Sequence, residues 1–456
     1  MTVMTAKRAL GLLLLTVLSA SLAFGCKDGD GNGPSNSTPG GVTTLTFWHS
    51  MQEPTASVLK SLVDEFNQSQ TQYRVNLIYQ GGYGDSFTKL RATSSDRPTV
   101  IQLSDTFTQI MIDNEVATPV QDFIDDEDYN LSDYEPKAIS YYSFDDKLWA
   151  MPFNLAGPLL YYDRAAFQDA GLDPDKPPTT LEEVREYSER LVQRDASGKT
   201  TRYGISLQVS PWVFEEMLAK AGALYANEDN GRAGRVTEVT FDGPEGQAII
   251  EWWEGMVKDG LAYNAGTDAL DQMLKLATGQ AAMAIQSTAV LRGAIAAAAL
   301  TGRDPKQFDA AAMPGPQGEG GGMVVGGAAL WVINESSDEQ QRGAWALMKF
   351  LTEPERQAQW HANTGYFPVR VSSYDLPPAV KARQDFPQFT RAVEQLHASP
   401  DVPATAGALL GPFDAIRDLL ARAFELSIAG SDPVQELQSA ASDANAQIEE
   451  YNRTAP

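Results

Sequence analysis

The chain has 456 residues, with 35 basic and 60 acidic side chains and a formal net charge of -25. Its acidic residues are scattered along the chain, which argues against nucleic acid and anionic membrane surfaces as binding partners. This length is too great for one ordinary hydrophobic core and predicts two lobes of about 150 to 200 residues each.

Residues 1–25 have the pattern of a secretory signal peptide. Lys7 and Arg8 precede an apolar run of about 16 residues, too short to span a bilayer comfortably. The run ends in "AFGC", which resembles a bacterial lipobox, although Ala23 stands where leucine is usual. We therefore expect cleavage before Cys26 and lipidation of its thiol; the alternative is an ordinary cleaved signal with a stray cysteine. Because Cys26 is the single cysteine, no disulfide can form within the chain.

After the leader, residues 27–42 are rich in Gly, Ser, Pro and Asn and predict a flexible tether behind Cys26. The next segments alternate between strand and helix patterns. Strands are predicted at "TTLTFWH" (43–49), "RVNLIYQ" (74–80) and "TVIQLSD" (99–105), with helices around residues 58–66 and 84–93. This rhythm predicts an α/β fold with a largely parallel sheet.

A second region of the same kind begins near residue 159. Thr180 and Glu183 form a capping box that predicts a helix start. A strand "AAMAIQS" (281–287), a glycine-rich segment (318–333) and several helices follow. Because open parallel sheets bind ligands beyond the carboxyl ends of their strands, the residues that end strands are the first site candidates. They include Trp48 and His49 of "FWHSM".

No familiar catalytic or metal motif is found. The three histidines, His49, His361 and His397, have no metal-ligand spacing, and the chain contains no P-loop and no nucleophile elbow. We therefore predict no metal, no cofactor and no catalytic residue. A secreted hydrolase remains an alternative without support from any motif.

Several motifs, in their order along the chain, resemble the extracellular solute-binding proteins of ABC importers, and most of all the glycerol-3-phosphate-binding branch. They are "FWHSM", "YQGGYGDSF", "PFN", "LLYYDR", "GQAAMAIQS", "VGGAALWVI" and "WHANTGYFPV". The resemblance covers residues 43–452 and implies a two-lobed periplasmic-binding-protein-like fold with the ligand in the interlobe cleft. By analogy, the first lobe holds residues 43–155 and 288–327, and the second holds 156–287 and 328–456.

The resemblance also implies a set of ligand-binding residues. It assigns phosphate contacts to Tyr83, Ser287, Gly327 through its backbone, Tyr366 and Arg417, and contacts with glycerol hydroxyls to Asp105. This chemistry is coherent, because a phosphate needs donors and an arginine can hold it with two parallel hydrogen bonds. Each residue has a plainer alternative: packing for the tyrosines, helix capping for Asp105 and Ser287, and a salt-bridged helix face for Arg417.

The chain departs from the glycerophosphate pattern at three positions. Leu155 and Ala156 replace a serine pair, and Val209 replaces a tryptophan over the glycerol, while Trp212 is retained. The extra room favours a ligand larger than glycerol phosphate, such as glycerophosphocholine, whose quaternary ammonium an aromatic face could accept. The same departures fit a carbohydrate-binding protein, in which Trp48 and Trp212 would stack on sugar rings.

The sequence thus predicts a substrate-binding lipoprotein that captures sn-glycerol 3-phosphate or a glycerophosphodiester and delivers it to ABC permease subunits. We expect it to act as a monomer outside the cytoplasm, in a periplasm or at a cell surface. It would touch the membrane through its lipid anchor and bind no nucleic acid.

Overall fold

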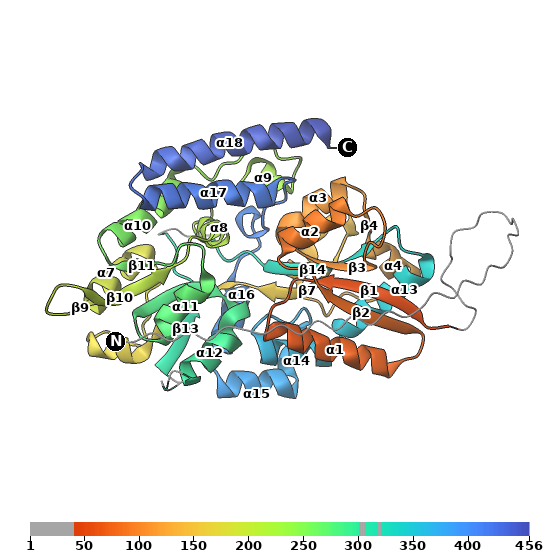
Figure 1. Ribbon diagram of the computed structural model, residues 1–456, viewed down its shortest axis with the longest axis horizontal. Helices are drawn as coiled ribbons and strands as arrows, with labels where there is room; N and C mark the ends of the chain where they lie inside the picture. The colour runs from red at the N-terminus through yellow and green to blue at the C-terminus, as the bar shows by residue number, and fades with distance from the viewer. Residues whose placement is uncertain (1–40, 301, 303, 305–306, 317–320, 456) are drawn as a thin grey trace, which may run out of the picture. The chain divides into compact units, whose positions relative to one another are not determined.

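Strands and helices alternate along the chain and gather into two sheets, one toward the right of Figure 1 and the other toward the left. The computed structural model describes residues 41–300, 302, 304, 307–316 and 321–455. The predicted signal peptide, Cys26 and nearly all of the predicted tether lie outside these residues. Residues 42–456 belong to one compact unit.

The first sheet has the strand order β2-β1-β3-β14-β4, with β7 also paired to β14. Strands β2 and β3 run parallel to β1, whereas β14 is antiparallel to β3, β4 and β7. Its strands are β1 (Thr43–His49), β2 (Tyr73–Tyr79), β3 (Val100–Ser104), β4 (Ala117–Thr118), β7 (Met151–Ala156) and β14 (Gly326–Ile333). The three strands predicted at the start of this region are confirmed.

The second sheet has the order β11-β10-β12-β8-β13, with β9 paired to β10. Strands β11 and β12 are parallel to β10, and β8 is antiparallel to both β12 and β13. Its strands are β8 (Pro158–Asp163), β9 (Gln193–Arg194), β10 (Thr200–Leu207), β11 (Ala262–Asn264), β12 (Ala281–Ser287) and β13 (Phe308–Ala312). A separate hairpin joins β5 (Ser143–Phe144) to β6 (Lys147–Leu148).

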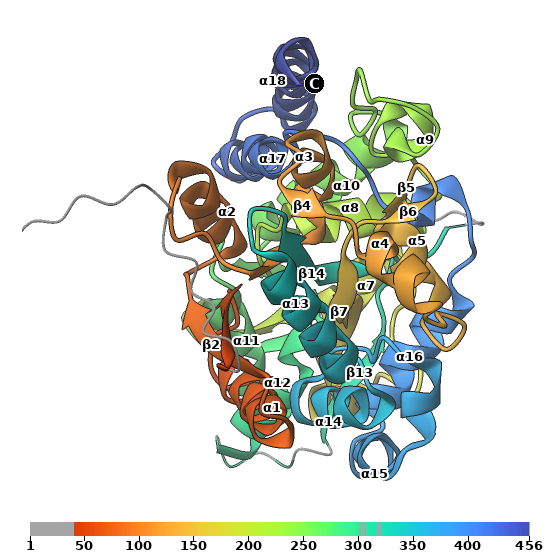
Figure 2. The same ribbon diagram turned by 90° about the vertical axis from the view of Figure 1, so that its right-hand side faces the viewer.

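Helices cover both sheets, as the two perpendicular views show (Figures 1 and 2). Those before β8 are α1 (Thr55–Ser69), α2 (Tyr83–Ala92), α3 (Thr108–Asp113), α4 (Val120–Glu127) and α5 (Pro136–Tyr141). Those between β8 and β13 are α6 (Arg164–Asp169), α7 (Leu181–Leu191), α8 (Pro211–Lys220), α9 (Asn227–Gly231), α10 (Pro244–Lys258), α11 (Ala269–Ala277) and α12 (Leu291–Leu300). Those after β14 are α13 (Asp338–Leu351), α14 (Pro354–Thr364), α15 (Pro377–Asp385), α16 (Gln388–Ala398), α17 (Phe413–Ile428) and α18 (Pro433–Thr454).

The helix starts follow local chemistry. The predicted capping box of α7 is present, with the Glu183 backbone N–H donating to Thr180 Oγ1 at 3.1 Å and the Thr180 N–H donating to a Glu183 carboxylate oxygen at 3.2 Å. Helix α1 buries Leu59, Leu62 and Val63 at the spacing of one helix face. Among the described residues, no helix is long and apolar enough to cross a membrane.

The strand pairing differs from the predicted division of the chain after residue 288. Strand β13 joins the second sheet, although our prediction places residues 288–327 in the first lobe. Strand β14 joins the first sheet, and α13 packs against β1, although our prediction places residues 328–456 in the second lobe. A strand pattern in the sequence does not reveal which sheet the strand joins, because its partners are remote in the chain.

Candidate functional site

Arg417 forms the centre of a buried polar cluster. It lies on α17, and its Nε and Nη2 donate to Glu215 Oε1 and Oε2 at 2.7 and 2.5 Å. Its Nη2 also lies 3.8 Å from Asp105 Oδ2. Glu215 comes from α8, on the side of the second sheet, whereas Asp105 directly follows β3 of the first sheet. The cluster therefore joins elements that pack on different sheets.

Burial sets the electrostatics of these groups. The Asp105 side chain is 8% exposed, and burial raises its pKa, while Arg417 acts in the opposite direction. Burial likewise raises the pKa of Glu215, again opposed by Arg417. For Arg417 burial acts to lower the pKa, but the charges of Glu215 and Asp105 together raise it. One guanidinium thus faces two carboxylates in a site of low polarity, where charge interactions are strong.

Two tyrosines approach the same region from the first sheet. Tyr83 is the first residue of α2, and Tyr366 follows Gly365, which ends α14 in a left-handed conformation. Asn154 of β7 donates a hydrogen bond to the Tyr83 hydroxyl at 3.3 Å. Burial raises the pKa of Tyr366 to about 12, and Asn154 acts in the opposite direction. The pKa of Tyr83 is raised well above its usual value, first by burial and then by the nearby Tyr366 and Asp105. Both hydroxyls are therefore protonated and able to donate at neutral pH.

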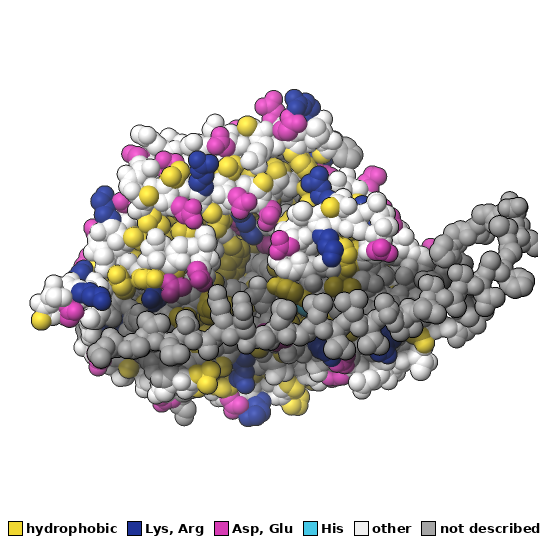
Figure 3. Space-filling model, in the orientation of Figure 1, with side chains coloured by type: hydrophobic (Ala, Val, Ile, Leu, Met, Phe, Trp, Pro, Cys, Tyr) yellow, Lys and Arg dark blue, Asp and Glu magenta, His cyan; other side chains and the backbone are white. Residues whose placement is uncertain are grey.

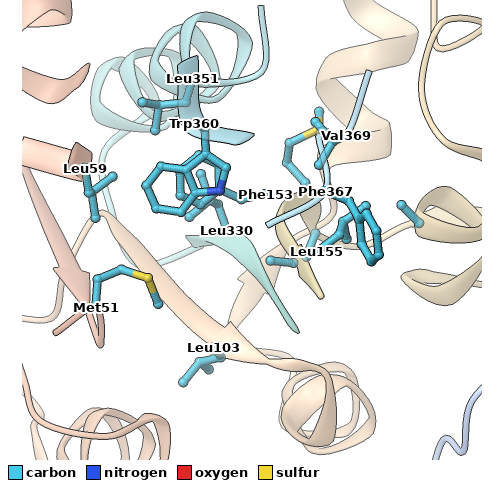
Figure 4. Close-up of a cluster of buried hydrophobic side chains, with 14 of the residues drawn as sticks. Met51, Leu59, Leu103, Phe153, Leu155, Leu330, Leu351, Trp360, Phe367 and Val369 are labelled. Atoms are coloured by element: carbon cyan, nitrogen blue, oxygen red, sulfur yellow. The ribbon is translucent and has the colours of Figure 1, made fainter. Parts of the chain in front are cut away.

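Packing holds Tyr366 in place. Its ring stacks on Trp360 with centroids 5.6 Å apart and an interplanar angle of 18°. The Nδ1 atom of His361 lies 2.7 Å from the Tyr366 carbonyl oxygen, and His361 is fully buried. Figure 4 shows Trp360 within the apolar cluster that also contains Phe153, Leu155 and Phe367. The aromatic side chain next to the site thus rests on a packed core.

A small cavity of about 20 Å³ adjoins the cluster. Asp105 and Tyr141 line it from one side and Trp212, Glu215 and Glu216 from the other. Glu216 is fully buried, which raises its pKa well above the usual value, and its Oε2 accepts from the Val324 N–H at 2.9 Å. Figure 3 shows a hollow on this face of the molecule with acidic side chains gathered along its upper edge. Predicted residue Trp212 therefore lies at the same site as Asp105 and Arg417.

Two other predicted residues are differently placed. Trp48 is only 4% exposed and belongs to the first hydrophobic core, with the Lys89 ammonium 4.7 Å from its ring centroid. The structure therefore makes Trp48 a packing residue and does not bring it to the cluster. Ser287 caps a short 3-10 helix, its hydroxyl accepting from the Ala289 N–H at 3.1 Å. The capping role that we weighed for Ser287 is thus present.

Gly327, to which the resemblance assigns a backbone contact with phosphate, has a structural reason to be glycine. Its φ is +118°, and a Cβ there would lie 2.0 Å from the carbonyl oxygen of Asn154. Glycine is required because β7 passes so close, in a conformation that other residues rarely adopt. The neighbouring Gly326 makes room for Trp212, since a Cβ there would lie 2.9 Å from the indole Nε1.

Sequence reasoning missed Asn154, Glu215 and Glu216. Asn154 and Glu216 carry weak local signals that we did not use. Asn154 is the one polar side chain in the apolar run "MPFNLAGPLL", and Glu216 lies in a helix between residues that are buried, such as Val213 and Met217. A polar group at a buried position needs a partner, which makes such residues candidates for a site. Among the described residues, no group of three or more His, Cys, Asp or Glu side chains is placed to hold a metal ion.

The chain crosses between two sheets that are covered by helices, and elements of both sheets build one buried polar cluster. This is the architecture of a two-lobed solute-binding protein. Residues 61–388 match the family model described as bacterial extracellular solute-binding protein. The chain therefore belongs to this family, and it serves as an extracytoplasmic substrate-binding protein for an ABC importer.

Curated relatives and solved structures agree with this family. The chain is 30% identical over 424 residues to the sn-glycerol-3-phosphate-binding periplasmic protein UgpB of Escherichia coli (strain K12), covering 91% of this chain and 94% of that protein. UgpB of Salmonella typhimurium is 30% identical over 417 residues, covering 89% and 92%.

Two solved structures share the fold. UgpB of Mycobacterium tuberculosis, in complex with glycerophosphocholine, has a TM-score of 0.75 at 24% identity and covers 91% of this chain and 100% of that one. The GacH receptor of Streptomyces glaucescens, solved unliganded and with acarbose, has a TM-score of 0.75 at 18% identity, covering 90% and 99%.

Proposed function

We propose that this protein captures a glycerophosphodiester, or sn-glycerol 3-phosphate, between lobes built on its two sheets, and hands it to the permease. The main support is the convergence of Tyr83, Asp105, Tyr366 and Arg417 from four distant parts of the chain. Tyrosine hydroxyls and a guanidinium suit the phosphate, and the Asp105 carboxylate suits glycerol hydroxyls. Trp212 borders the cavity beside Asp105, Gly327 would contribute a backbone contact, and Ser287 would contribute only if its capping bond is given up.

The charge of the cluster favours a diester over a monoester. A phosphate monoester carries close to two negative charges at neutral pH, because its second pKa is about 6. A diester carries one. Arg417 is already shared between Glu215 and Asp105, so each added negative charge is less well compensated. The names of the relatives point to the same ligand class, since UgpB proteins bind sn-glycerol 3-phosphate and one was solved with glycerophosphocholine.

We also propose that Cys26 is lipidated and tethers the protein to the outer side of a membrane. The protein would work there as a monomer. Ligand binding would draw the two lobes together, because the contacts come from both, and the permease would read the closed form. This is a population shift between two arrangements of the same lobes. No enzymatic step is required for such a role.

A thermal-shift panel tests the ligand. It would contain sn-glycerol 3-phosphate, glycerophosphocholine, glycerophosphoglycerol, inorganic phosphate and maltooligosaccharides. A ligand at one hundred times its Kd stabilises the folded protein by about 2.7 kcal/mol. With an unfolding entropy of about 2.1 cal/mol/K per residue, this corresponds to a Tm increase of about 3 °C for a chain of this size. We expect the largest increase with a diester.

Arg417→Ala is the decisive variant. It leaves Glu215 buried without its partner, so the absolute Tm is expected to fall, and the ligand-induced increase is therefore the readout. We expect that increase to disappear for phosphate esters. Arg422→Ala, an exposed arginine on the same helix, is the matched control and should keep it. A carbohydrate-binding protein, as the GacH-like fold allows, would instead respond to sugars alone and would keep that response in Arg417→Ala.

A further inference from the structure

A line of buried amides runs from the end of β1 to the Tyr83 hydroxyl. The backbone N–H of Ser50 donates to Gln102 Oε1 at 3.2 Å. Gln102 Nε2 donates to Asn154 Oδ1 at 2.7 Å, and Asn154 Nδ2 donates to the Tyr83 hydroxyl at 3.3 Å. Gln102 and Asn154 are both fully buried. Three elements of the first sheet thus contribute to one continuous series of hydrogen bonds.

The direction of this series is fixed at its first link. Amide oxygens and nitrogens are exchangeable by a flip, so a pair of amides alone has no defined direction. A backbone N–H, however, can only donate. Ser50 therefore requires the oxygen of Gln102, which turns the Gln102 NH₂ toward Asn154 and the Asn154 NH₂ toward Tyr83. Every later link follows from the first.

The geometry of the sheet makes the series possible. Asn154 and Ser104 both pair with Ala328 of β14, so they lie on the same face as Gln102, which is two residues before Ser104. The short Ala328 side chain lets the two amides meet across β14. The neighbours of Asn154 in β7, Phe153 and Leu155, belong to the apolar cluster of Figure 4.

A hydroxyl that accepts from Asn154 cannot also donate to it. The Asn154 bond acts to lower the pKa of Tyr83, against the larger effect of burial, as expected when the phenol oxygen is the acceptor. Within the described part of the chain, the Tyr83 O–H proton has no hydrogen-bond acceptor. It is left to point into the site.

We infer that Gln102 and Asn154 form a relay of positioning residues that makes the Tyr83 hydroxyl a donor toward the ligand, and so selects a ligand group rich in acceptors, such as phosphate oxygens. This inference rests on the proposed function. Neither amide needs to touch the ligand. The relay fixes the direction of the Tyr83 proton before the ligand arrives, which lowers the cost of ordering that proton on binding.

Gln102→Glu tests the direction of the relay at pH 8. One carboxylate oxygen still accepts from Ser50, but the other now faces Asn154, which must flip to donate to it. The Asn154 oxygen then faces Tyr83 and takes its proton. In the wild type, Tyr83→Phe is expected to raise the Kd for a glycerophosphodiester by roughly tenfold or more, the value of a hydrogen bond to a charged group. In Gln102→Glu the same change is expected to cost less than about twofold.

This double-mutant comparison separates donor direction from charge or damage to packing. Repulsion by the new carboxylate weakens both Gln102→Glu proteins alike, so it leaves the ratio for Tyr83→Phe unchanged. Gln247→Glu, on α10 of the second lobe, is the matched background, in which Tyr83→Phe should keep its full cost. If Gln102→Glu does not fold, Asn154→Asp gives the same prediction, because its carboxylate accepts the Tyr83 proton directly.

The outcomes are distinct. A full cost of Tyr83→Phe in the Gln102→Glu or Asn154→Asp background overturns the relay and leaves the proposed ligand intact. A wild-type protein that binds no phosphate ester by calorimetry overturns both, since the relay is proposed to serve that group. A cost confined to the wild-type and Gln247→Glu backgrounds supports the relay.

Discussion

Tyr451 near the end of α18 donates to Asp113 Oδ2 on α3 at 2.7 Å, and this bond joins the two sides of the molecule. Figure 1 shows the end of α18 above α3. Arg235 Nη2 lies 3.2 Å from the other Asp113 oxygen, but its side chain is 40% exposed, so its contribution is small. Asp113, Arg235 and Asn452 help to line a cavity of about 380 Å³ between these elements. The hydroxyl of Tyr451 is therefore the stronger link.

Tyr451→Phe removes this hydroxyl and keeps the ring that packs against Gly411. A hydrogen bond to a charged acceptor contributes about 1.5 to 3 kcal/mol. Asp113 keeps Arg235 and Gln109 as partners. The substitution should favour the open arrangement of the lobes by that amount. Since ligand binds the closed arrangement, the apparent Kd should rise by at most about 10-fold to 150-fold, as the closed fraction falls.

Calorimetry for the Kd and small-angle X-ray scattering for the ligand-free radius of gyration measure this effect. The radius should increase in Tyr451→Phe and return to the wild-type value at saturating ligand. Tyr187→Phe removes a hydroxyl that donates to the Lys176 carbonyl within the second lobe and should change neither quantity. If Tyr451→Phe matches the wild type in both measurements, this bond has no part in closure.

Two further predictions concern stability. Burial lowers the pKa of His361 to about 4. His361 is therefore protonated near pH 6.5 in the unfolded chain but only near pH 4 in the folded protein. Relative to His361→Gln, the wild type should lose up to about 3 kcal/mol of unfolding free energy as the pH falls from 6.5 to 4. Urea denaturation measures both proteins, and a difference in unfolding free energy that does not change with pH would contradict this prediction. A Cβ at Gly204 would lie 2.4 Å from the Ser188 Cα, so Gly204→Ala should destabilise the protein by about 1 to 3 kcal/mol and lower the Tm. Gly293→Ala on α12, where a Cβ meets nothing within 4 Å, should not lower it.

Local patterns predicted the local structure well. Strands β1, β2 and β3, helices α1 and α2 and the cap of α7 follow from apolar spacing and capping residues, which depend on near neighbours in the chain. The sheet that each late strand joins could not be read in this way. The positions of β13 and β14 depend on strand partners more than a hundred residues away.

The site was predictable only in part. Resemblance to a family supplied Tyr83, Asp105, Tyr366 and Arg417, and the structure brings these four together. The carboxylate of Glu215 and the amide of Asn154 were not predicted. The role of an acid on a helix or an amide in a strand depends on the side chain that it contacts, and the local sequence does not show that contact. Trp48 shows the converse, since an aromatic residue at a strand end looks alike in sequence whether it faces a ligand or a core.

The late arrival of β14 governs the order in which this protein can fold. Residues 326–333 supply a strand between β3 and β4 that also holds β7, so the first sheet stays incomplete until most of the chain has been made. Contacts between parts so far apart in sequence form slowly. This protein works outside the cytoplasm, and a sheet that closes only with the final third of the chain leaves the N-terminal part without a complete fold while the rest is still being made.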